Sequence, residues 1–190
     1  MDKARLEAFT DGVIAIIITI MVLELKVPQG HTVAALTSGI PVLLAYALSY
    51  VNVGIFWNNH HHMLQATERV DGNVLWCNLL LLFWISLMPF TIRWMDETQF
   101  ASTPTASYGV ILVLSALSYL LLERAIVRCN GEDSVLARAV GGNDKKSVIS
   151  LAIYLVAIPL AYCRPLAAIA LYLLNALIWF VPDRRIEKLV

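Results

Sequence analysis

The chain has 190 residues, of which 59% are hydrophobic and only 15% are charged, and its 14 basic and 14 acidic side chains leave no net charge. Soluble domains usually carry about 25% charged residues, and the mean hydropathy here is +0.71. The composition therefore excludes an ordinary soluble domain and indicates an integral membrane protein. We expect no nucleic-acid partner.

The first predicted helix covers residues 6–25, and Arg5, Glu7 and Asp11 stand at its entrance. Acidic residues precede its apolar run and no small-residue cleavage site follows it, so we expect a retained membrane span rather than a signal peptide. Ionisable residues in a span are costly and usually face protein or water instead of lipid. The entrance of this helix is thus the first candidate for function.

Five further apolar segments follow, each near the ~20 residues that cross the hydrocarbon core as a helix. They cover residues 33–62, 73–95, 105–127, 147–163 and 165–181. We expect Pro89 to kink the third span, and Arg164-Pro165 to form a tight turn between the last two. Residues 128–146 form the one sizeable polar loop, which is too short for a nucleotide site or a catalytic domain. The sequence predicts an all-α membrane protein with residues 1–190 as a single six-span domain.

The distribution of basic residues predicts the orientation of these spans. Of the 14 Lys and Arg residues, Lys26, Arg93 and Arg164 flank one side, which leaves 11 on the side that holds both termini. Basic residues accumulate in cytoplasmic loops. We therefore predict a protein of the cell membrane with both termini in the cytoplasm.

The first helix has two candidate faces. A projection at 100° per residue puts Glu7, Thr10 and Asp11 on one side. The other side holds mostly apolar residues: Arg5, Phe9, Gly12, Ile16, Ile20 and Leu23, with Thr19 at the edge. Either Asp11 lines a water-filled path, or it locks this helix to its neighbours while the apolar stripe lines the path. Periodicity does not choose between these arrangements.

The predicted topology also collects polar residues in the cytoplasmic third of the first three spans, where they could satisfy one another across helices. These residues are Arg5, Thr10, Asp11, Asn58, His60, Asn73 and Asn78. Residues 60–62 are three consecutive histidines, which point about 100° apart on a helix and cannot chelate one ion. We expect no fixed metal site and no cofactor, and expect His60 alone to face inward.

The opening residues resemble the R-x-x-x-F-S-D signature of the transmembrane protein 175 family, the lysosomal and prokaryotic potassium channels. Arg5, Phe9, Thr10 and Asp11 carry the likeness, with Thr10 in place of the family's serine. It continues through about the first 95 residues in three further matches: Trp57-x-x-His60, Asn78-Leu79 and Met88-Pro89-Phe90.

The resemblance implies a homotetrameric, potassium-selective channel, because the chain carries one six-helix repeat where eukaryotic members carry two. The first helix of each subunit would line the pore. By position relative to Asp11, the constriction would lie at Ile16, followed by Thr19 or Ile20 and then Leu23, with the permeant K⁺ passing near Ile16 and Thr19. Arg5 and Asp11 would serve the scaffold. Their partners there would be Trp57, His60 and Asn78.

Other function classes compete with this interpretation. A proton-coupled secondary transporter would also use intramembrane Asp and His residues, but the chain lacks the Gly- or Pro-broken helix pairs near mid-depth that are typical of transporters. An enzyme is disfavoured because no nucleophile stands at a recognisable spacing from His60 and Asp11. A structural subunit without transport is the third alternative. Protons are a second candidate permeant ion beside K⁺.

Overall fold

The computed structural model describes residues 2–27, 30–140 and 145–180, and all regular secondary structure within them is helical. The helices, in chain order, are α1 (Lys3–Leu23), α2 (Val33–Ser38), α3 (Ile40–Gln65), α4 (Gly72–Ser86), α5 (Met88–Glu97), α6 (Ser102–Asn130), α7 (Val135–Val140), α8 (Lys145–Cys163) and α9 (Pro165–Phe180). An all-α protein was predicted, and the described part of the chain has that architecture. The outermost basic residues of the predicted topology, beyond residue 180, lie outside the described residues.

Local sequence explains where several helices begin and where two predicted spans divide. The Asp2 and Asp71 carboxylates cap α1 and α4 by accepting from the backbone N–H groups of the first turn. The span predicted at 33–62 is divided near Gly39, immediately before the Pro-containing start of α3. The span predicted at 73–95 is divided at Leu87, two residues before Pro89. A proline ring clashes with the carbonyl one turn back, which ends the preceding helix.

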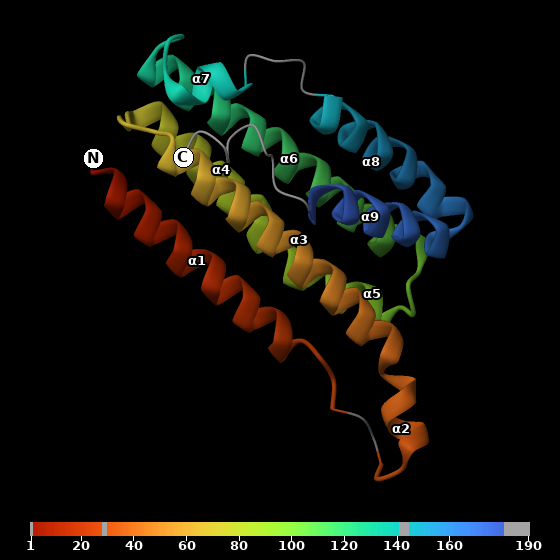
Figure 1. Ribbon diagram of the computed structural model, residues 1–190. Coiled ribbons are helices and arrows are strands. Elements are labelled where there is room, and N and C mark those ends of the chain that lie inside the picture. The colour runs from red at the N-terminus through yellow and green to blue at the C-terminus, as the bar shows by residue number, and fades with distance from the viewer. Residues whose placement is uncertain (1, 28–29, 141–144, 181–190) are drawn as a thin grey trace.

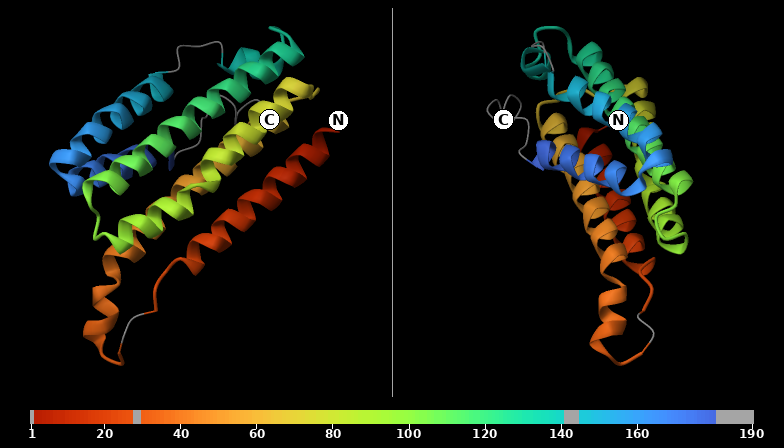
Figure 2. Two further views of the ribbon diagram at one scale, coloured as in Figure 1. Left: turned by 180° about the vertical axis from the view of Figure 1, so that it is seen from behind. Right: turned by 90° about the vertical axis from the view of Figure 1, so that its right-hand side faces the viewer.

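The helices form an elongated bundle with α6 near its centre (Figures 1 and 2). α6 packs against α4 and α5 on one side and against α8 and α9 on the other, while α1 packs on α3, α4 and α5 at one edge. The start of α1, the α3–α4 link and the end of α6 lie at one end of the bundle (Figure 1). The α5–α6 and α8–α9 turns lie at the opposite end, and the second of these is a single residue, Arg164.

Two close polar contacts join the central helix to its neighbours. The Tyr108 hydroxyl of α6 accepts from Ser49 Oγ at 2.9 Å and from Asn52 Nδ2 at 3.0 Å, both on α3. A Cβ atom at Gly109 would collide with the Tyr172 hydroxyl of α9, so glycine permits the closest approach of these helices. The core therefore combines apolar packing with hydrogen bonds that fix the register of α3 against α6.

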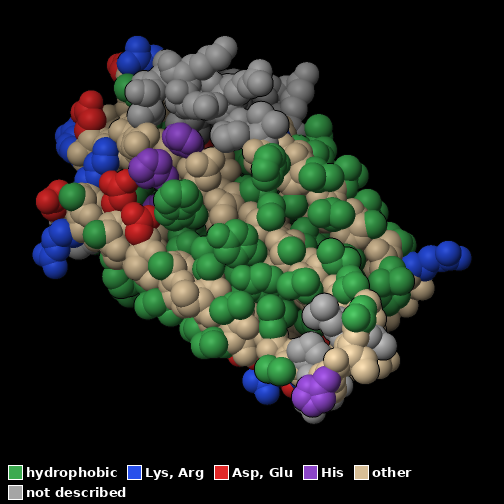
Figure 3. Space-filling view, turned by 60° about the horizontal axis from the view of Figure 1, so that its bottom comes forward, with side chains coloured by type: hydrophobic (Ala, Val, Ile, Leu, Met, Phe, Trp, Pro, Cys, Tyr) green, Lys and Arg blue, Asp and Glu red, His purple; other side chains and the backbone are tan. Residues whose placement is uncertain are grey.

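The outer surface matches a lipid environment. Among the described residues, five segments are long and apolar enough to cross a bilayer, and Pro165–Phe180 is a shorter apolar helix. Apolar side chains cover the broad middle of the molecule, whereas charged and histidine side chains gather mainly at one end (Figure 3). Soluble monomers rarely expose such large apolar areas. The fold is that of a multi-pass membrane protein.

Candidate functional site

Helix α1 has one face in the bundle and one face outside it. The buried face consists of Leu6, Thr10, Ile14, Ile17 and Met21. The opposite face holds the predicted pore stripe, where Ile16 is 58% exposed, Ile20 42% and Leu23 80%. Thr19 is exposed with them. The stripe predicted to line a path is therefore the face of α1 that the rest of the chain leaves open.

A buried chain of hydrogen bonds ties α1 to α3 and α4. The Asn78 carboxamide Nδ2 donates to Thr10 Oγ1 at 2.9 Å, and its Oδ1 lies 2.7 Å from His60 Nε2. All three residues are buried, with Thr10 and Asn78 wholly inaccessible to solvent. Since a carboxamide oxygen can only accept, the Nε2 of His60 is the donor. We call these hydrogen bonds the Thr10–Asn78–His60 network. Its three residues lie in one layer, as the sequence predicted.

Asp11 is bound to α3 next to this network. Its carboxylate accepts from the indole Nε1 of Trp57 at 2.8 Å. The Trp57 ring stacks on His61 at 5.9 Å between centroids, and His61 Nδ1 lies 3.1 Å from Glu7 Oε1. The sequence left open whether Asp11 lines a water-filled path or locks α1 to its neighbours. The contact with Trp57 is the kind expected if Asp11 locks α1 to a neighbouring helix. The Glu7–His61 pair was not predicted, because nothing in the sequence pairs those two positions.

Other residues expected in the polar layer lie apart from it. Arg5 and Phe9 are exposed on the stripe side of α1. Within residues 2–27, 30–140 and 145–180, the Arg5 side chain makes no hydrogen bond or ion pair. Arg5 is therefore not bonded to Trp57, His60 or Asn78 within one subunit. Arg5 projects from the helix surface instead, because its angular position differs from that of Thr10. Asn58 and Asn73 likewise take no part in the network. Over the described residues, no three His, Cys, Asp or Glu side chains gather as metal ligands.

Ion pairs hold the other end of α1. Glu24 Oε2 lies 3.1 Å from Arg93 Nη1 of α5, and Arg93 Nε lies 3.1 Å from Glu97 Oε1. Lys26 Nζ lies 3.2 Å from Asp96 Oδ2. We call these contacts the outer clamp. The outer clamp was not predicted, although Arg93 and Glu97 stand at i and i+4, a spacing that indicates the ion pair between them.

A surface hollow lies between the polar network and the outer clamp. It has a volume of 530 Å³ and is lined by α1, α4 and α5, including Ile16, Ile20, Phe90 and Arg93. Beside it, the Thr19 hydroxyl donates to the Ile16 carbonyl at 2.8 Å. Because that hydroxyl donates its hydrogen bond within the helix, its oxygen lone pairs remain available to a ligand on the exposed face.

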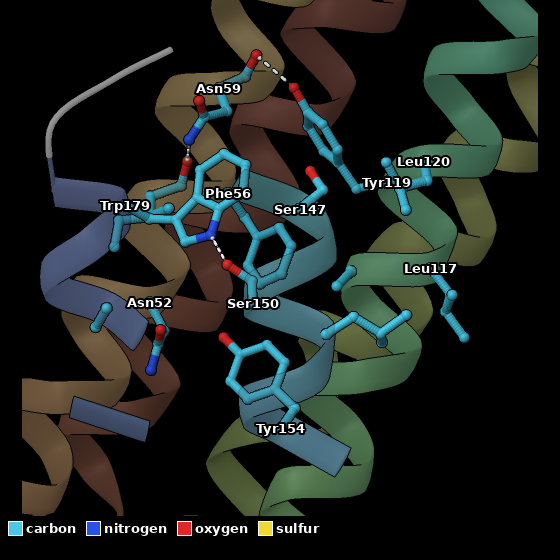
Figure 4. A pocket seen from close by; sticks show the side chains of 14 residues that line it. Asn52, Phe56, Asn59, Leu117, Tyr119, Leu120, Ser147, Ser150, Tyr154 and Trp179 are labelled. Atoms are coloured by element: carbon cyan, nitrogen blue, oxygen red, sulfur yellow. Dashed lines mark hydrogen bonds between the residues drawn. The ribbon is translucent and has the colours of Figure 1, made fainter. Parts of the chain in front are cut away.

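A smaller cavity of 60 Å³ lies on the far side of the bundle, between α3, α6, α8 and α9 (Figure 4). Its walls include the aromatic rings of Phe56, Tyr119, Tyr154 and Trp179. The Trp179 indole donates to Ser150 Oγ, and the Tyr119 hydroxyl donates to the Asn59 carbonyl at 3.2 Å (Figure 4). No residue of α1 lines it. This cavity is separate from the predicted pore stripe.

The family model described as endosomal/lysosomal potassium channel TMEM175 matches residues 5–89. A potassium channel of Chryseobacterium sp. (strain P1-3) is 52% identical over 188 residues, covering 99% of this chain and 97% of the relative. The human endosomal/lysosomal proton channel TMEM175 is 31% identical over 116 residues, which are 55% of this chain but only 23% of that longer protein.

A solved structure shares the fold. The crystal structure of a lysosomal potassium-selective channel TMEM175 homologue from Chamaesiphon minutus superposes with a TM-score of 0.81. The match covers 95% of this chain and 97% of that one, at 27% sequence identity. The likeness therefore extends beyond the residues that the family model matches and includes α6, α8 and α9.

Proposed function

The chain belongs to the TMEM175 family, and we propose that it is a potassium-selective channel of the cell membrane. The proposal draws on the near full-length likeness to a bacterial protein named as a potassium channel. It draws equally on a fold shared with a potassium-selective homologue. Both termini would face the cytoplasm, because most basic residues accompany that end of the spans.

The pore in this proposal is made by four copies of the chain, each contributing the exposed face of α1. The observation that carries the proposal is the contrast on that helix between Ile17, 3% exposed, and Ile16, 58% exposed. A single subunit cannot enclose a path with one convex helix. Symmetric copies that turn the same face toward a common axis can do so.

The constriction would be a ring of Ile16 side chains. A narrow apolar ring bars ions because water leaves it, and a small widening lets water and a cation enter. Ile20 and Leu23 continue the same face toward the outer end. Thr19, whose oxygen lone pairs remain free, would offer oxygen ligands to a partly dehydrated K⁺ between these apolar levels.

The polar residues would act as scaffold rather than as pore lining. The Thr10–Asn78–His60 network and the Asp11–Trp57 bond fix the rotation of α1 about its own axis. A helix turned by one residue rotates its side chains by about 100°, which would carry Ile16 away from the axis. Ion selection at Ile16 would therefore depend on contacts about one to two turns away.

The test is flux of K⁺ and Na⁺ into liposomes that contain the purified protein. We expect Ile16→Asn to raise the flux and to weaken the preference for K⁺, because the ring becomes wettable. Ile149→Asn is the matched control, since Ile149 is 51% exposed on α8 and away from α1. It should leave both quantities unchanged. Equal effects of the two substitutions would contradict a constriction at Ile16.

The same liposomes separate the competing functions. A secondary transporter would saturate at a low turnover, and its flux would respond to Asp11→Asn but not to Ile16→Asn. Proton uptake, measured with an internal pH dye, tests whether H⁺ passes as well; the vertebrate relatives are named as proton channels. No flux from wild type or variant would favour a structural subunit.

A further inference from the structure

A second surface hollow lies between α6, α7 and α8, on the other side of the bundle from the pore stripe. It has a volume of 720 Å³, within the range of about 300–1,000 Å³ typical of small-molecule sites. Its apolar wall comes mainly from α6 and α8: Leu117, Leu120, Leu121, Val127, Val148 and Leu151. Arg124 and Arg128 stand above this wall on α6.

The two arginines are unpaired like charges. They are four residues apart on one helix face, and both are exposed; such pairs repel each other. In the described part of the chain, neither side chain makes a hydrogen bond or an ion pair. Two acids also border the hollow: Glu132 is exposed, and Glu123 is buried and already has an interaction. An anion from outside the chain would relieve the repulsion.

The length of α6 sets the depth of this hollow in a bilayer. The helix has 29 residues, about 43 Å at 1.5 Å per residue, which equals the full thickness of a bilayer with its headgroups. The hydrocarbon core takes about 20 of those residues, so with α6 centred in the bilayer Arg128 would lie among the headgroups and Arg124 near their inner boundary. The Lys146 ammonium lies 4.4 Å from the ring centroid of Trp179 on α9, and tryptophan is enriched at the membrane–water interface.

We propose that this hollow binds an anionic phospholipid. The phosphate pairs with the Arg124 and Arg128 guanidinium groups, which match its oxygens in fork geometry, and one acyl chain lies along the seam of α6 and α8. Four residues of that seam, Leu117, Leu120, Ser147 and Leu151, also line the inner cavity of Figure 4. The lipid would thus cover the thin wall of a cavity inside the subunit. This site is independent of the proposed conduction path.

The test is lipid binding to the whole protein in detergent, followed by native mass spectrometry. Phosphatidylglycerol is the probe, and phosphatidylcholine with the same chains is the neutral reference. We expect wild type to prefer phosphatidylglycerol, and Arg124→Gln/Arg128→Gln to bind it about thirtyfold more weakly. The control Arg69→Gln/Arg164→Gln removes two exposed arginines elsewhere and should bind like wild type.

A second variant separates a built site from general attraction to charge. Val148→Trp fills the hollow without altering any charge, and Val148 is exposed on α8, so the fold should tolerate it. We expect it to weaken phosphatidylglycerol binding as well. Unchanged binding by Val148→Trp, equal loss in the arginine control, or competition by soluble glycerol 3-phosphate at equal affinity would each overturn the proposal.

Discussion

The two faces of α1 are chemically alike but lie in different surroundings. Both are rich in isoleucine, yet Ile14 and Ile17 are packed against the bundle while Ile16 and Ile20 are exposed. The difference between the faces comes from the first three turns, where Thr10 and Asp11 find partners on α3 and α4. In the proposed function, a short polar segment therefore sets the orientation of a long apolar one.

The comparison explains why acidic and hydroxyl residues stand at the entrance of a membrane span. Apolar contacts within a bilayer give weak preference for one rotation, because lipid tails are as apolar as the helix surface. A buried hydrogen bond is directional and is lost when the helix rotates. The two faces and the two ends of α1 should therefore respond differently to substitution.

The buried face should be far less tolerant of a polar residue than the exposed face. We expect Ile17→Asn to lower the free energy of unfolding by about 2–4 kcal/mol, because it leaves a cavity and an unpaired amide in the core. Ile16→Asn, one residue away, should cost much less. Thermal unfolding in detergent measures both. Similar losses would mean that the exposed face is packed in the assembled protein as tightly as the buried one.

The Thr10–Asn78–His60 network should contribute more to the free energy of unfolding than an exposed amide on the same helix. Asn78→Ala removes the partner of both Thr10 and His60, so we expect a loss of about 1–3 kcal/mol. Asn73→Ala is the control, because Asn73 is exposed on α4. Asn78→Ala should also change the K⁺/Na⁺ permeability ratio in liposomes. A destabilised variant with an unaltered ratio would separate the network from the pore geometry.

The exposed face should contain one polar determinant of selectivity. Thr19→Val keeps the shape of the side chain and removes its oxygen, and we expect the K⁺/Na⁺ permeability ratio to fall by about fivefold, the equivalent of one net polar contact. Bi-ionic potentials give the ratio directly. An unchanged ratio would leave the selectivity to Ile16 and its apolar neighbours.

The outer clamp should contribute least to the stability of the fold. Its ion pairs are largely exposed, with the Arg93 side chain 56% accessible, and exposed pairs are weak and screened by salt. We expect Arg93→Gln to lower the melting temperature by less than Asn78→Ala, and the difference from wild type to shrink at high salt. A loss that persists in high salt would mean that packing of the arginine stem outweighs its charge.

Much of the fold could be read from hydropathy. The spans were predicted within a few residues of α1, α6, α8 and α9, since long apolar runs bounded by charge and proline leave little choice. The breaks before α3 and α5 are local proline effects, and only that at Pro89 was expected. The relative placement of helices was less predictable, because apolar helices lack a marked hydrophobic face in lipid.

The candidate site, like the fold, could be predicted from the sequence only in part. The shared layer of Thr10, His60 and Asn78 followed from topology and polarity, because buried polar groups seek partners at equal depth. The individual pairs did not follow: Arg5 stays outside the network, and Glu24 meets Arg93 across 69 positions of sequence. Such long-range pairs depend on side-chain geometry that periodicity does not contain.

The attachment of α1 at both ends has a mechanical consequence. Hydrogen bonds at Thr10 and Asp11 and the ion pair at Glu24 hold α1 near its two ends, and the hollow of 530 Å³ lies beside the segment between these contacts. A helix held near both ends bends most at its midpoint. Any bending of α1 therefore moves Ile16 and Ile17 farthest, while the contacts near its two ends stay in place.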